Sequence, residues 1–406
     1  MSSLHVVIGG GPAGVFAAIR CKTCNPSAQV VLLEKTNQLL AKVRISGGGR
    51  CNVTHACFDP RQLIQNYPRG AKELLGPFHH FQPKDTVSWF EDRGVFLKTE
   101  DDGRMFPVTD SSETIVQCLL KEAAHAGIEI RKQQRIQSLQ KLEDHFLIQL
   151  DNQQIKANSI LLATGSSSWG HGLAKEFGHT IIKPVPSLFT FNIPSSPLLD
   201  LSGISVSEVI VSLKGFDLKQ KGPVLLTHWG FSGPAILKLS AWAARALYDL
   251  SYKAVLQINW LAALNQEIIY QNLVQSKINH PLQAMPSLLP SNLLSRLCAD
   301  LHMDSTIALG RLPNKTLEQL AAKLYCDEYL IEGQTTYKQE FVTAGGVDLR
   351  GIDFRTMESK IVPGLFFAGE ILNIDGVTGG FNFQNAWTTG WLAGTGMGNL
   401  KSCIHL

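Results

Sequence analysis

Residues 4–14 read Leu-His-Val-Val-Ile-Gly-Gly-Gly-Pro-Ala-Gly, so a short apolar run leads directly into a glycine-rich turn. A second apolar run, Val30–Leu33, ends at Glu34. This order of strand, glycine turn, helix, strand and acidic residue is typical of a dinucleotide-binding βαβ unit. The stretch therefore predicts a Rossmann-type fold that holds a dinucleotide.

Each glycine of the turn has its own physical role. Gly9 allows a tight turn, Gly11 lets the backbone approach a pyrophosphate, and Gly14 lets the helix pack close to the strand. The pyrophosphate then lies at a helix N-terminus, where free N–H groups favour negative charge. A carboxylate at Glu34 accepts from a ribose hydroxyl and disfavours a 2′-phosphate, so the sequence predicts FAD or NAD rather than NADP as the bound dinucleotide.

Composition limits the class of protein. A chain of 406 residues predicts two or three domains, and the net charge of +3 is too small to indicate nucleic-acid binding by itself. No apolar run approaches the ~18 residues that span a membrane, and the chain starts with the first strand rather than a signal peptide, so we expect a cytoplasmic protein without a membrane partner. The eight cysteines are then expected to be reduced, and Cys21 and Cys24 to be unlinked thiols.

Changes in the sequence pattern along the chain, from strand-like to helical, suggest where domains begin and end. We expect a discontinuous dinucleotide domain at 1–186 and 341–406, a β-rich insertion at 187–260, and a helical subdomain at 261–340. The pattern over 261–332 indicates helix throughout.

Within the first segment the sequence predicts further elements. Asp110-Ser111 is expected to cap a helix that ends near Ala126, and the alternating runs between 135 and 156 predict an antiparallel meander. Strands are expected at 128–130 and 159–165, and the last helix at about 385–392.

Three further glycine-rich segments are suited to contacting the dinucleotide. Arg44–Thr54 contains three consecutive glycines whose N–H groups can face a phosphate or a ring edge. Leu162–Gly165 is a strand end that reaches the dinucleotide. The third segment, Phe367–Asn382, starts with a strand that ends in glycine and an acid at Glu370. Gly376–Asn382 precedes a helix whose N–H groups can stabilise negative charge on a reduced ring.

Four ordered motifs resemble one flavoprotein family. Ser46–Thr54, Leu226–Ala235, Thr356–Lys360 and Phe367–Asn382 are similar to the BaiN/YhiN-like, or aminoacetone-oxidase-like, family of NAD(P)/FAD-dependent oxidoreductases. The resemblance implies a two-dinucleotide-binding FAD domain of the glutathione-reductase type, interrupted by a β-rich insertion and a helical subdomain.

The resemblance also implies which residues contact FAD, held tightly but not covalently. The adenine contact is expected at Ile136. The full set of expected cofactor contacts is Gly9, Gly10, Gly11, Pro12, Ala13, Gly14, Glu34, Lys35, Lys42, Ser46, Gly47, Gly48, Gly49, Arg50, Cys51, Asn52, Ile136, Ala163, Thr164, Gly165, Gly369, Glu370, Gly379, Gly380, Phe381 and Asn382.

Family members are associated with reducing activated C=C bonds, including steroid-type enones and a uracil ring of ribosomal RNA, and with amine oxidation. Our interpretation is NAD(P)H-driven reduction of an activated C=C bond. The alternatives are an oxidase of a small amine such as aminoacetone, a ribosomal RNA uridine reductase that forms dihydrouridine, and a flavin-binding scaffold without turnover. Because the sequence shows no second GxGxxG domain, NAD(P)H is expected to bind transiently or to be replaced by another donor. Lys214, Lys219 and Lys221 are the basic residues that an RNA partner would favour.

Reduction of a C=C bond also needs a proton donor. The candidates are Cys51, His55, His228 and Tyr337, while Arg50 is expected to hold a phosphate. No spacing of metal ligands and no Ser-His-Asp arrangement stands out, so no metal is expected.

The chain also departs from the family pattern, at Leu40-Ala41-Lys42, His55, Ser166, Asn373 and Phe381. His55, Phe381 and the nearby Trp169 are expected to line the site, and the substrate therefore does not follow from the resemblance.

Overall fold

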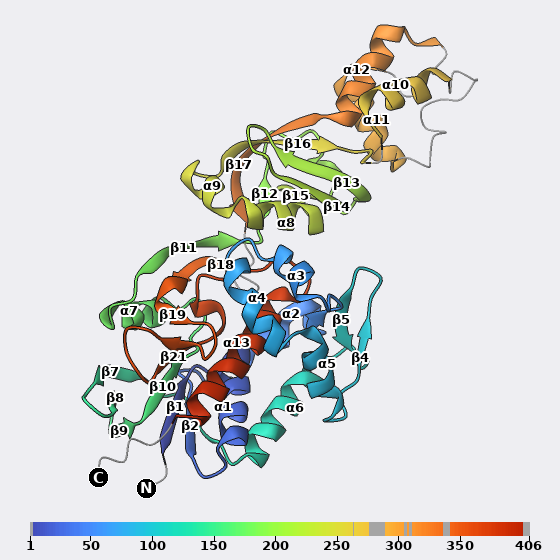
Figure 1. Cartoon of the computed structure of the whole chain (residues 1–406). Coiled ribbons are helices and arrows are strands. Elements are labelled where there is room, and N and C mark those ends of the chain that lie inside the picture. The colour runs from blue at the N-terminus through green and yellow to red at the C-terminus, as the bar shows by residue number, and fades with distance from the viewer. Residues whose placement is uncertain are drawn as a thin grey trace. The chain divides into compact units, whose positions relative to one another are not determined.

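The computed structural model describes residues 3–262, 264–275, 289–303, 307, 311–335 and 342–400. The chain divides into two compact units (Figure 1). The first unit combines residues 1–185 with 338–406, and the second is residues 186–337.

A seven-stranded sheet forms the centre of the first unit, in the order β19-β20-β21-β10-β1-β2-β6. Its five strands from β21 to β6 run parallel, and they are almost entirely apolar where both faces of the sheet are covered. The strands are β1 (Leu4–Ile8), β2 (Gln29–Leu33), β6 (Glu129–Arg131), β10 (Ser159–Leu162), β19 (Ile352–Asp353), β20 (Glu358–Ser359) and β21 (Leu365–Phe367).

Two helices pack closely beside this sheet, α1 (Pro12–Cys24) and α13 (Phe381–Gly398). Glycines of α13 make the close approach possible. A Cβ at Gly390 would lie 2.7 Å from the carbonyl oxygen of Ala13, and one at Gly394 would collide with the carbonyl oxygen of Ala17. Figure 1 shows the two helices side by side, and because Gly390 lies against Ala13, the first turns of α13 extend past the start of α1.

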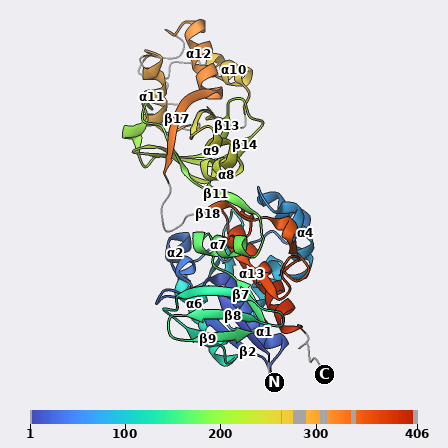
Figure 2. The same ribbon diagram turned by 90° about the vertical axis from the view of Figure 1, so that its left-hand side faces the viewer.

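Smaller elements complete the first unit. The meander β7–β8–β9 faces the viewer in Figure 2. The remaining elements of this unit are α2 (Ala41–Gly49), β3 (Thr54–His55), α3 (Pro60–Leu63), η1 (Ile64–Asn66), α4 (Ala71–His80), α5 (Pro83–Glu91), β4 (Leu97–Thr99), β5 (Arg104–Pro107), α6 (Ser112–His125), β7 (Ile136–Lys141), β8 (Phe146–Leu150), β9 (Gln154–Ala157), α7 (Ser168–Glu176), β11 (Ile181–Ser187), β18 (Val342–Val347), η5 (Leu349–Gly351) and η6 (Gly369–Ile371).

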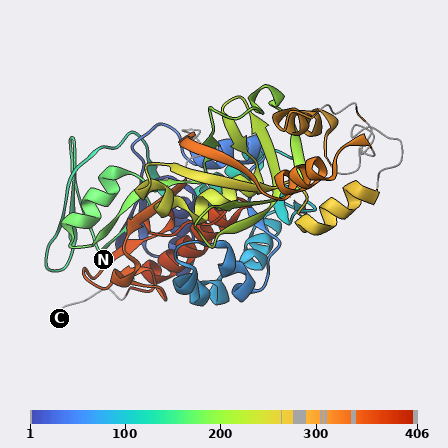
Figure 3. The same cartoon turned by 90° about the horizontal axis from the view of Figure 1, so that it is seen from above.

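The second unit is a closed barrel, in the order β12-β15-β14-β13-β16-β17, joined by helices. Helices α10, α11 and α12 gather at one side of the barrel (Figure 3), and their buried leucines share one hydrophobic cluster with the barrel strands. The elements are β12 (Thr190–Asn192), η2 (Leu199–Leu201), β13 (Ser205–Leu213), β14 (Lys219–Thr227), β15 (Gly230–Ser232), α8 (Pro234–Trp242), α9 (Ala244–Asp249), β16 (Lys253–Asn259), α10 (Gln266–Gln275), α11 (Ser291–Asp300), α12 (Asn314–Tyr325) and β17 (Asp327–Thr335).

Most elements expected in the first unit are present. The βαβ unit, the helix that begins after Ser111, the meander and both expected strands are confirmed, although the Ser111 side chain makes no capping hydrogen bond. The expectation of helix over all of 261–332 is wrong at its end, where β17 closes the barrel. Burial along this segment alternates with a period of two, which is typical of a strand. Asp327, Tyr329 and Ile331 are buried, and the residues between them are exposed. The last helix is also longer than expected.

No helix in the described part of the chain combines the length and the apolar character needed to cross a membrane.

Candidate dinucleotide site

The candidate site lies where parallel strands of the first unit end together. Gly9 N–H donates to the carbonyl of Leu33 at 2.9 Å, and Ala163 N–H donates to the carbonyl of Ile8 at 2.9 Å. Ala368 N–H donates to the carbonyl at the end of β10 at 3.2 Å. The carboxyl ends of β2, β1, β10 and β21 thus form one edge, the position at which doubly wound sheets bind nucleotides.

The turn between β1 and α1 has the shape of a phosphate cradle. Gly9 has a φ of +113°, and a Cβ there would collide with the carbonyl oxygen of Ala163. A Cβ at Gly14 would collide with the carbonyl oxygen of Gly9, whereas a Cβ at Gly11 would meet no atom within 4 Å. Gly9 and Gly14 are therefore required by the fold, whereas Gly11 borders open space at the N-terminus of α1. This is the arrangement that a pyrophosphate needs.

Glu34 is held at the end of β2 by three donors. Its Oε2 accepts from Gly10 N–H at 2.8 Å, and its Oε1 accepts from the N–H and the hydroxyl of Thr36, each at 2.8 Å. Because a carboxylate offers about four acceptor sites, it retains capacity for a ribose hydroxyl. Gln134 N–H donates to the carbonyl of Glu34 at 2.9 Å, which leads the chain past this point to Ile136 at the start of β7.

The consecutive glycines at the end of α2 leave helical geometry. Ser46 is extended, and Gly47, Gly48 and Gly49 all have positive φ, of 58°, 68° and 85°. Additional Cβ atoms at Gly48 and Gly49 would meet nothing within 4 Å. A run of such residues presents successive N–H groups to one side, which suits an anion or a ring edge.

Cys51 follows this loop with a φ of +62° and is fully buried. Burial raises the pKa of the Cys51 thiol to about 12. At neutral pH the group is therefore an unionised, packed thiol.

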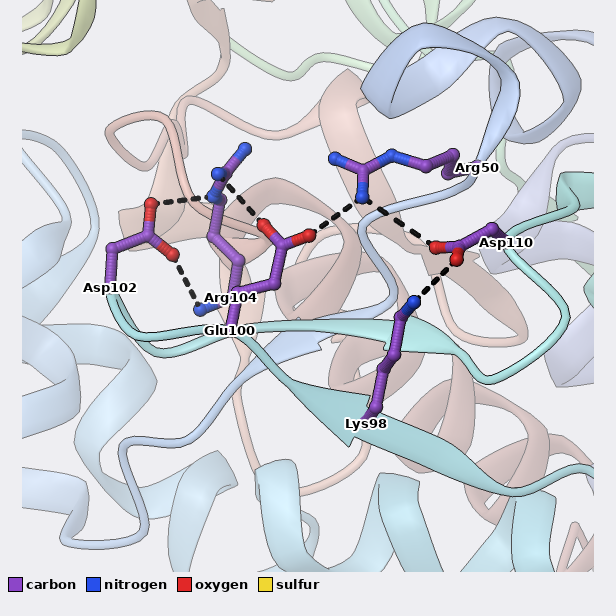
Figure 4. Close-up of polar contacts among 6 residues, drawn as sticks. All are labelled: Arg50, Lys98, Glu100, Asp102, Arg104 and Asp110. Atoms are coloured by element: carbon purple, nitrogen blue, oxygen red, sulfur yellow. Dashed lines mark hydrogen bonds and ion pairs between the residues drawn. The ribbon is translucent and has the colours of Figure 1, made fainter.

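Arg50 belongs to a network of charges on the hairpin β4–β5 (Figure 4). Its guanidinium lies 2.6 Å from Glu100 and 3.6 Å from Asp110, and it stacks 4.0 Å above the ring of Phe106. A Cβ at Gly47 would lie 3.0 Å from the same ring, so Phe106 supports the glycine loop from below. In this arrangement Arg50 ties the loop to the hairpin.

Figure 4 also shows how the other charges of the network pair. Lys98 binds Asp110, and Arg104 bridges Glu100 at 2.9 Å and Asp102 at 2.7 Å. Three cations and three anions therefore neutralise one another beside the glycine loop.

Two buried hydroxyls near this edge lack a hydrogen-bond partner. They are Oγ1 of Thr164, after β10, and Oγ1 of Thr343, at the start of β18. Thr343 N–H donates to Glu370 at 3.1 Å, and the other oxygen of Glu370 pairs with Lys42. An unsatisfied buried hydroxyl is costly, so these atoms indicate a polar ligand or ordered water at this edge.

The N-terminus of α13 is the fourth glycine segment. Gly379 and Gly380 have φ of +131° and +93°, and a Cβ at Gly380 would lie 2.5 Å from the carbonyl oxygen of Thr54. Asn52, with its amide oriented to satisfy both ends, accepts from Gly380 N–H and donates to the carbonyl of Thr54, each at 3.0 Å. The Asn382 side chain makes two hydrogen bonds to the backbone of Gly376, at 2.9 and 2.8 Å.

The candidate proton donors lie in different places. His55 stacks on Phe381 with ring centroids 4.7 Å apart, and its Nε2 lies 3.1 Å from the carbonyl of Asp102, to which it donates. His228 is exposed in the turn between β14 and β15, in the second unit. Tyr337 lies outside the described residues.

The glycine segments, Glu34, Lys42, Glu370 and Asn382 thus surround one edge of the first unit. Lys35 is exposed beside Glu34, and Trp169 is 40% exposed in the first turn of α7. Within the described ranges, no group of three or more His, Cys, Asp or Glu side chains could hold a metal ion.

Sequence reasoning missed three residues that support this edge, namely Tyr67, Arg69 and Asp375. The Tyr67 hydroxyl donates to the carbonyl of Phe381 at 2.6 Å, and Arg69 pairs with the buried Asp375. Tyr67 and Arg69 lie in a segment without glycine-rich or periodic pattern, and only the position of Asp375 beside a glycine-rich segment could have indicated it.

These observations fit FAD: the open cradle at Gly11, the unpartnered hydroxyls of Thr164 and Thr343, and two further glycine segments whose N–H groups suit phosphate and ring edges.

Comparisons with known proteins identify the family. Residues 3–396 match the model of the family described as HI0933-like protein Rossmann domain. A 3-dehydro-bile acid delta(4,6)-reductase of Clostridium scindens is 27% identical, with 96% of this chain and 97% of the relative covered. A ribosomal RNA dihydrouridine synthase of Escherichia coli is 28% identical, with 95% and 96% covered.

Among solved structures, the open form of a flavocytochrome c3 fumarate reductase shares the fold. Its TM-score is 0.51 at 17% identity, over 98% of this chain and 78% of that one. Sequence, site and fold lead to one conclusion: the chain belongs to the HI0933-like Rossmann family and is an FAD-dependent oxidoreductase.

Proposed function

We propose that this enzyme uses FAD to reduce a C=C bond conjugated to a carbonyl group, with NAD(P)H as the donor of electrons. One observation carries the proposal. Two relatives that align over nearly the whole chain are named for reactions that saturate a C=C bond, in a 3-dehydro bile acid and in uridine. In both substrates the reduced C=C bond is conjugated to a carbonyl group.

Bound FAD supplies the hydride chemistry, and the residues of the chain hold and tune it. We assign the pyrophosphate to the cradle at Gly11, the ribose to Glu34, and the adenine to the start of β7 at Ile136. The free N–H groups in the first turn of α13 are assigned to the pyrimidine end of the flavin, where they stabilise negative charge, since the N–H of Gly380 is already bonded to Asn52.

The three described candidates differ in how readily they can donate a proton. Cys51 is unsuited, because a buried thiol with a pKa of about 12 gives up its proton reluctantly at neutral pH. The Nε2 proton of His55 is directed to the carbonyl of Asp102, which supports a role in positioning. Of the three candidates, only His228 is exposed, and it stays our proposed donor. Replacement by glutamine should lower the rate with substrate and leave reduction of the flavin unchanged.

A second candidate, reduction of a uracil base in RNA, is favoured by the name of the Escherichia coli relative. Two of the lysines expected to attract RNA have acidic partners on the surface. Lys214 pairs with Glu328 and Lys221 with Glu208, each at 3.0 Å, so two of the three lysines expected to attract RNA are partly neutralised.

The test begins with anaerobic titration of the purified protein with NADH and NADPH, followed by the visible spectrum. Bleaching of the flavin band is expected, because NAD(P)H is proposed to be the donor. A yellow protein that neither coenzyme bleaches contradicts this part of the proposal. A steroid-type enone and a uridine-containing ribosomal RNA fragment are then offered to the reduced protein, and recovery of colour identifies the substrate class.

A further inference from the structure

We infer that Tyr67 and Arg69 are positioning residues for the loop that carries the flavin-facing glycines, Ile374–Phe381. They belong to residues 66–70, the last residue of η1 and the short connection to α4, which we call the strap. The inference rests on the proposed placement of FAD at the N-terminus of α13.

The strap contacts the loop at both ends and in the middle. Val377 N–H donates to the carbonyl of Asn66 at 2.9 Å. The Tyr67 hydroxyl donates to the carbonyl of Phe381, the first residue of α13, at 2.6 Å. At the other end of the strap, a Cβ at Gly70 would lie 2.5 Å from Cγ1 of Ile374.

Between these contacts lies a buried ion pair. Nε and Nη2 of Arg69 donate to the two carboxylate oxygens of Asp375, a bidentate arrangement. The side chain of Asp375 is fully buried and that of Arg69 is 15% exposed. Because a buried carboxylate needs its partner, the pair fixes one geometry of the loop rather than several.

The loop needs such support because of its composition. Gly376, Gly379 and Gly380 lie within it, and glycines lose more conformational freedom than other residues when they are ordered. The loop also ends at the N-terminus of α13, so its position decides where the free N–H groups point. Holding the loop in place therefore reduces the entropic cost of ordering it when FAD binds, and it aligns those N–H groups in advance.

Tyr67 acts through the loop and not as an acid. Its side chain is 1% exposed, and burial holds the pKa of its hydroxyl well above the ordinary value. Its proton is directed to a backbone carbonyl, and its ring packs against Phe381 and Phe78 at centroid distances of 6.1 and 5.5 Å.

The experiment compares Tyr67→Phe and Arg69→Lys in the FAD-loaded enzyme. The first variant removes one hydroxyl and keeps the packing, and the second keeps the charge but loses the bidentate contact. We expect FAD to bind about fivefold more weakly in Y67F, from one neutral hydrogen bond, and about tenfold or more in R69K. The midpoint potential of the flavin should fall in both, since the reduced ring loses aligned donors.

Matched controls separate positioning from general loss of stability. Tyr329→Phe removes a buried hydroxyl in the second unit, where Tyr329 donates to Asp327. Arg93→Lys removes a guanidinium that pairs with Glu122 at 2.8 Å, in a different part of the first unit. Both should leave FAD affinity and potential at the wild-type values.

The inference would be overturned by strap variants that have a lower melting temperature but the FAD affinity and midpoint potential of the wild type. It would also be overturned if the control variants changed the affinity and the potential as much as the strap variants do. The readouts concern the flavin alone. An enzyme that fails to reduce enones or RNA therefore tells against the proposed function and not against the strap.

Discussion

Glycines of the turn between β1 and α1 are needed for two different reasons. At Gly14 the obstacle is the protein itself, the carbonyl oxygen of Gly9. At Gly11 the backbone has an ordinary extended φ of −80°, and the space beside it is open. A pyrophosphate is the group that we expect to fill that space.

Gly11→Ala and Gly14→Ala should therefore fail in opposite ways. G11A is expected to fold with the stability of the wild-type protein without cofactor but to bind FAD at least a hundredfold more weakly, since a methyl group occupies the place of the phosphate. G14A is expected to lose roughly 2–4 kcal/mol of stability, from strain against backbone atoms. Thermal melts with and without FAD, together with flavin fluorescence, measure both effects. A G11A protein that retains FAD would refute the assignment of the cradle.

A second residue-scale prediction concerns His5, which is fully buried in β1 between Ser3 and Ser159 at 3.0 and 2.7 Å. Burial lowers the pKa of His5 from 6.5 to about 4. The unfolded chain takes up this proton near pH 6.5 and the folded protein only near pH 4, so stability falls as the pH drops through that window. Between pH 7 and pH 5 the loss from this group is about 2 kcal/mol.

Denaturation by urea at both pH values tests the assignment to His5. The difference between pH 7 and pH 5 should be smaller in His5→Gln than in the wild type by about that amount, whatever the variant's own stability. Equal differences in the two proteins would mean that other groups set the acid sensitivity.

Side-chain roles were harder to predict than backbone roles. The glycine cradle follows from steric rules that act within a few residues, and the sequence pattern is enough to locate it. The partners of Arg50 could not be predicted, since Glu100 and Asp110 reach it only after the hairpin β4–β5 has folded back on the glycine loop. An arginine beside three glycines looks the same in sequence whether it meets a phosphate or two carboxylates.

At the scale of elements, the contact between α1 and α13 depends on a stripe of small residues. Gly390, Gly394 and Gly398 recur every four residues and so lie on one face of α13. Added Cβ atoms at all three would meet backbone atoms of α1. The close packing of these helices fixes the position of α13 along α1.

Gly394→Ala should therefore destabilise the protein by about 2–4 kcal/mol, although alanine is the better helix former. Gly172→Ala provides the matched comparison. Gly172 is an exposed glycine in α7 whose Cβ would meet nothing within 4 Å, so alanine there should add up to about 1 kcal/mol of stability. Chemical denaturation compares the two, and destabilisation by both would show that steric contact is not the cause.

Elements with a strong local period could be predicted, and those decided by distant partners could not. The βαβ unit and the meander carry clear patterns, whereas β17 follows a helical region directly and owes its state to pairing with β16 and β12. Similarly, α13 begins at Phe381, four residues earlier than expected, because its first turn is fixed by Tyr67 and by the loop before it.

At the scale of the whole molecule, the proposed cofactor contacts belong to the first unit. Hydrogen exchange measured with and without FAD should therefore slow around 9–14, 46–54 and 376–385, where ordering by the ligand is expected. Peptides from the barrel, such as those that cover β13 and β16, should exchange at the same rate in both states. Protection by FAD confined to the barrel would contradict the assigned site.

The discontinuity of the first unit has a consequence for synthesis on the ribosome. A nascent chain that ends at residue 337 already contains every strand of the barrel, but β10 still lacks its neighbour β21, and α1 lacks α13. The inserted unit is thus complete while the surrounding one still waits for two of its central elements. With FAD placed as proposed, its uptake requires the last part of the chain, so we expect a prematurely terminated product to be a colourless protein with an exposed sheet edge.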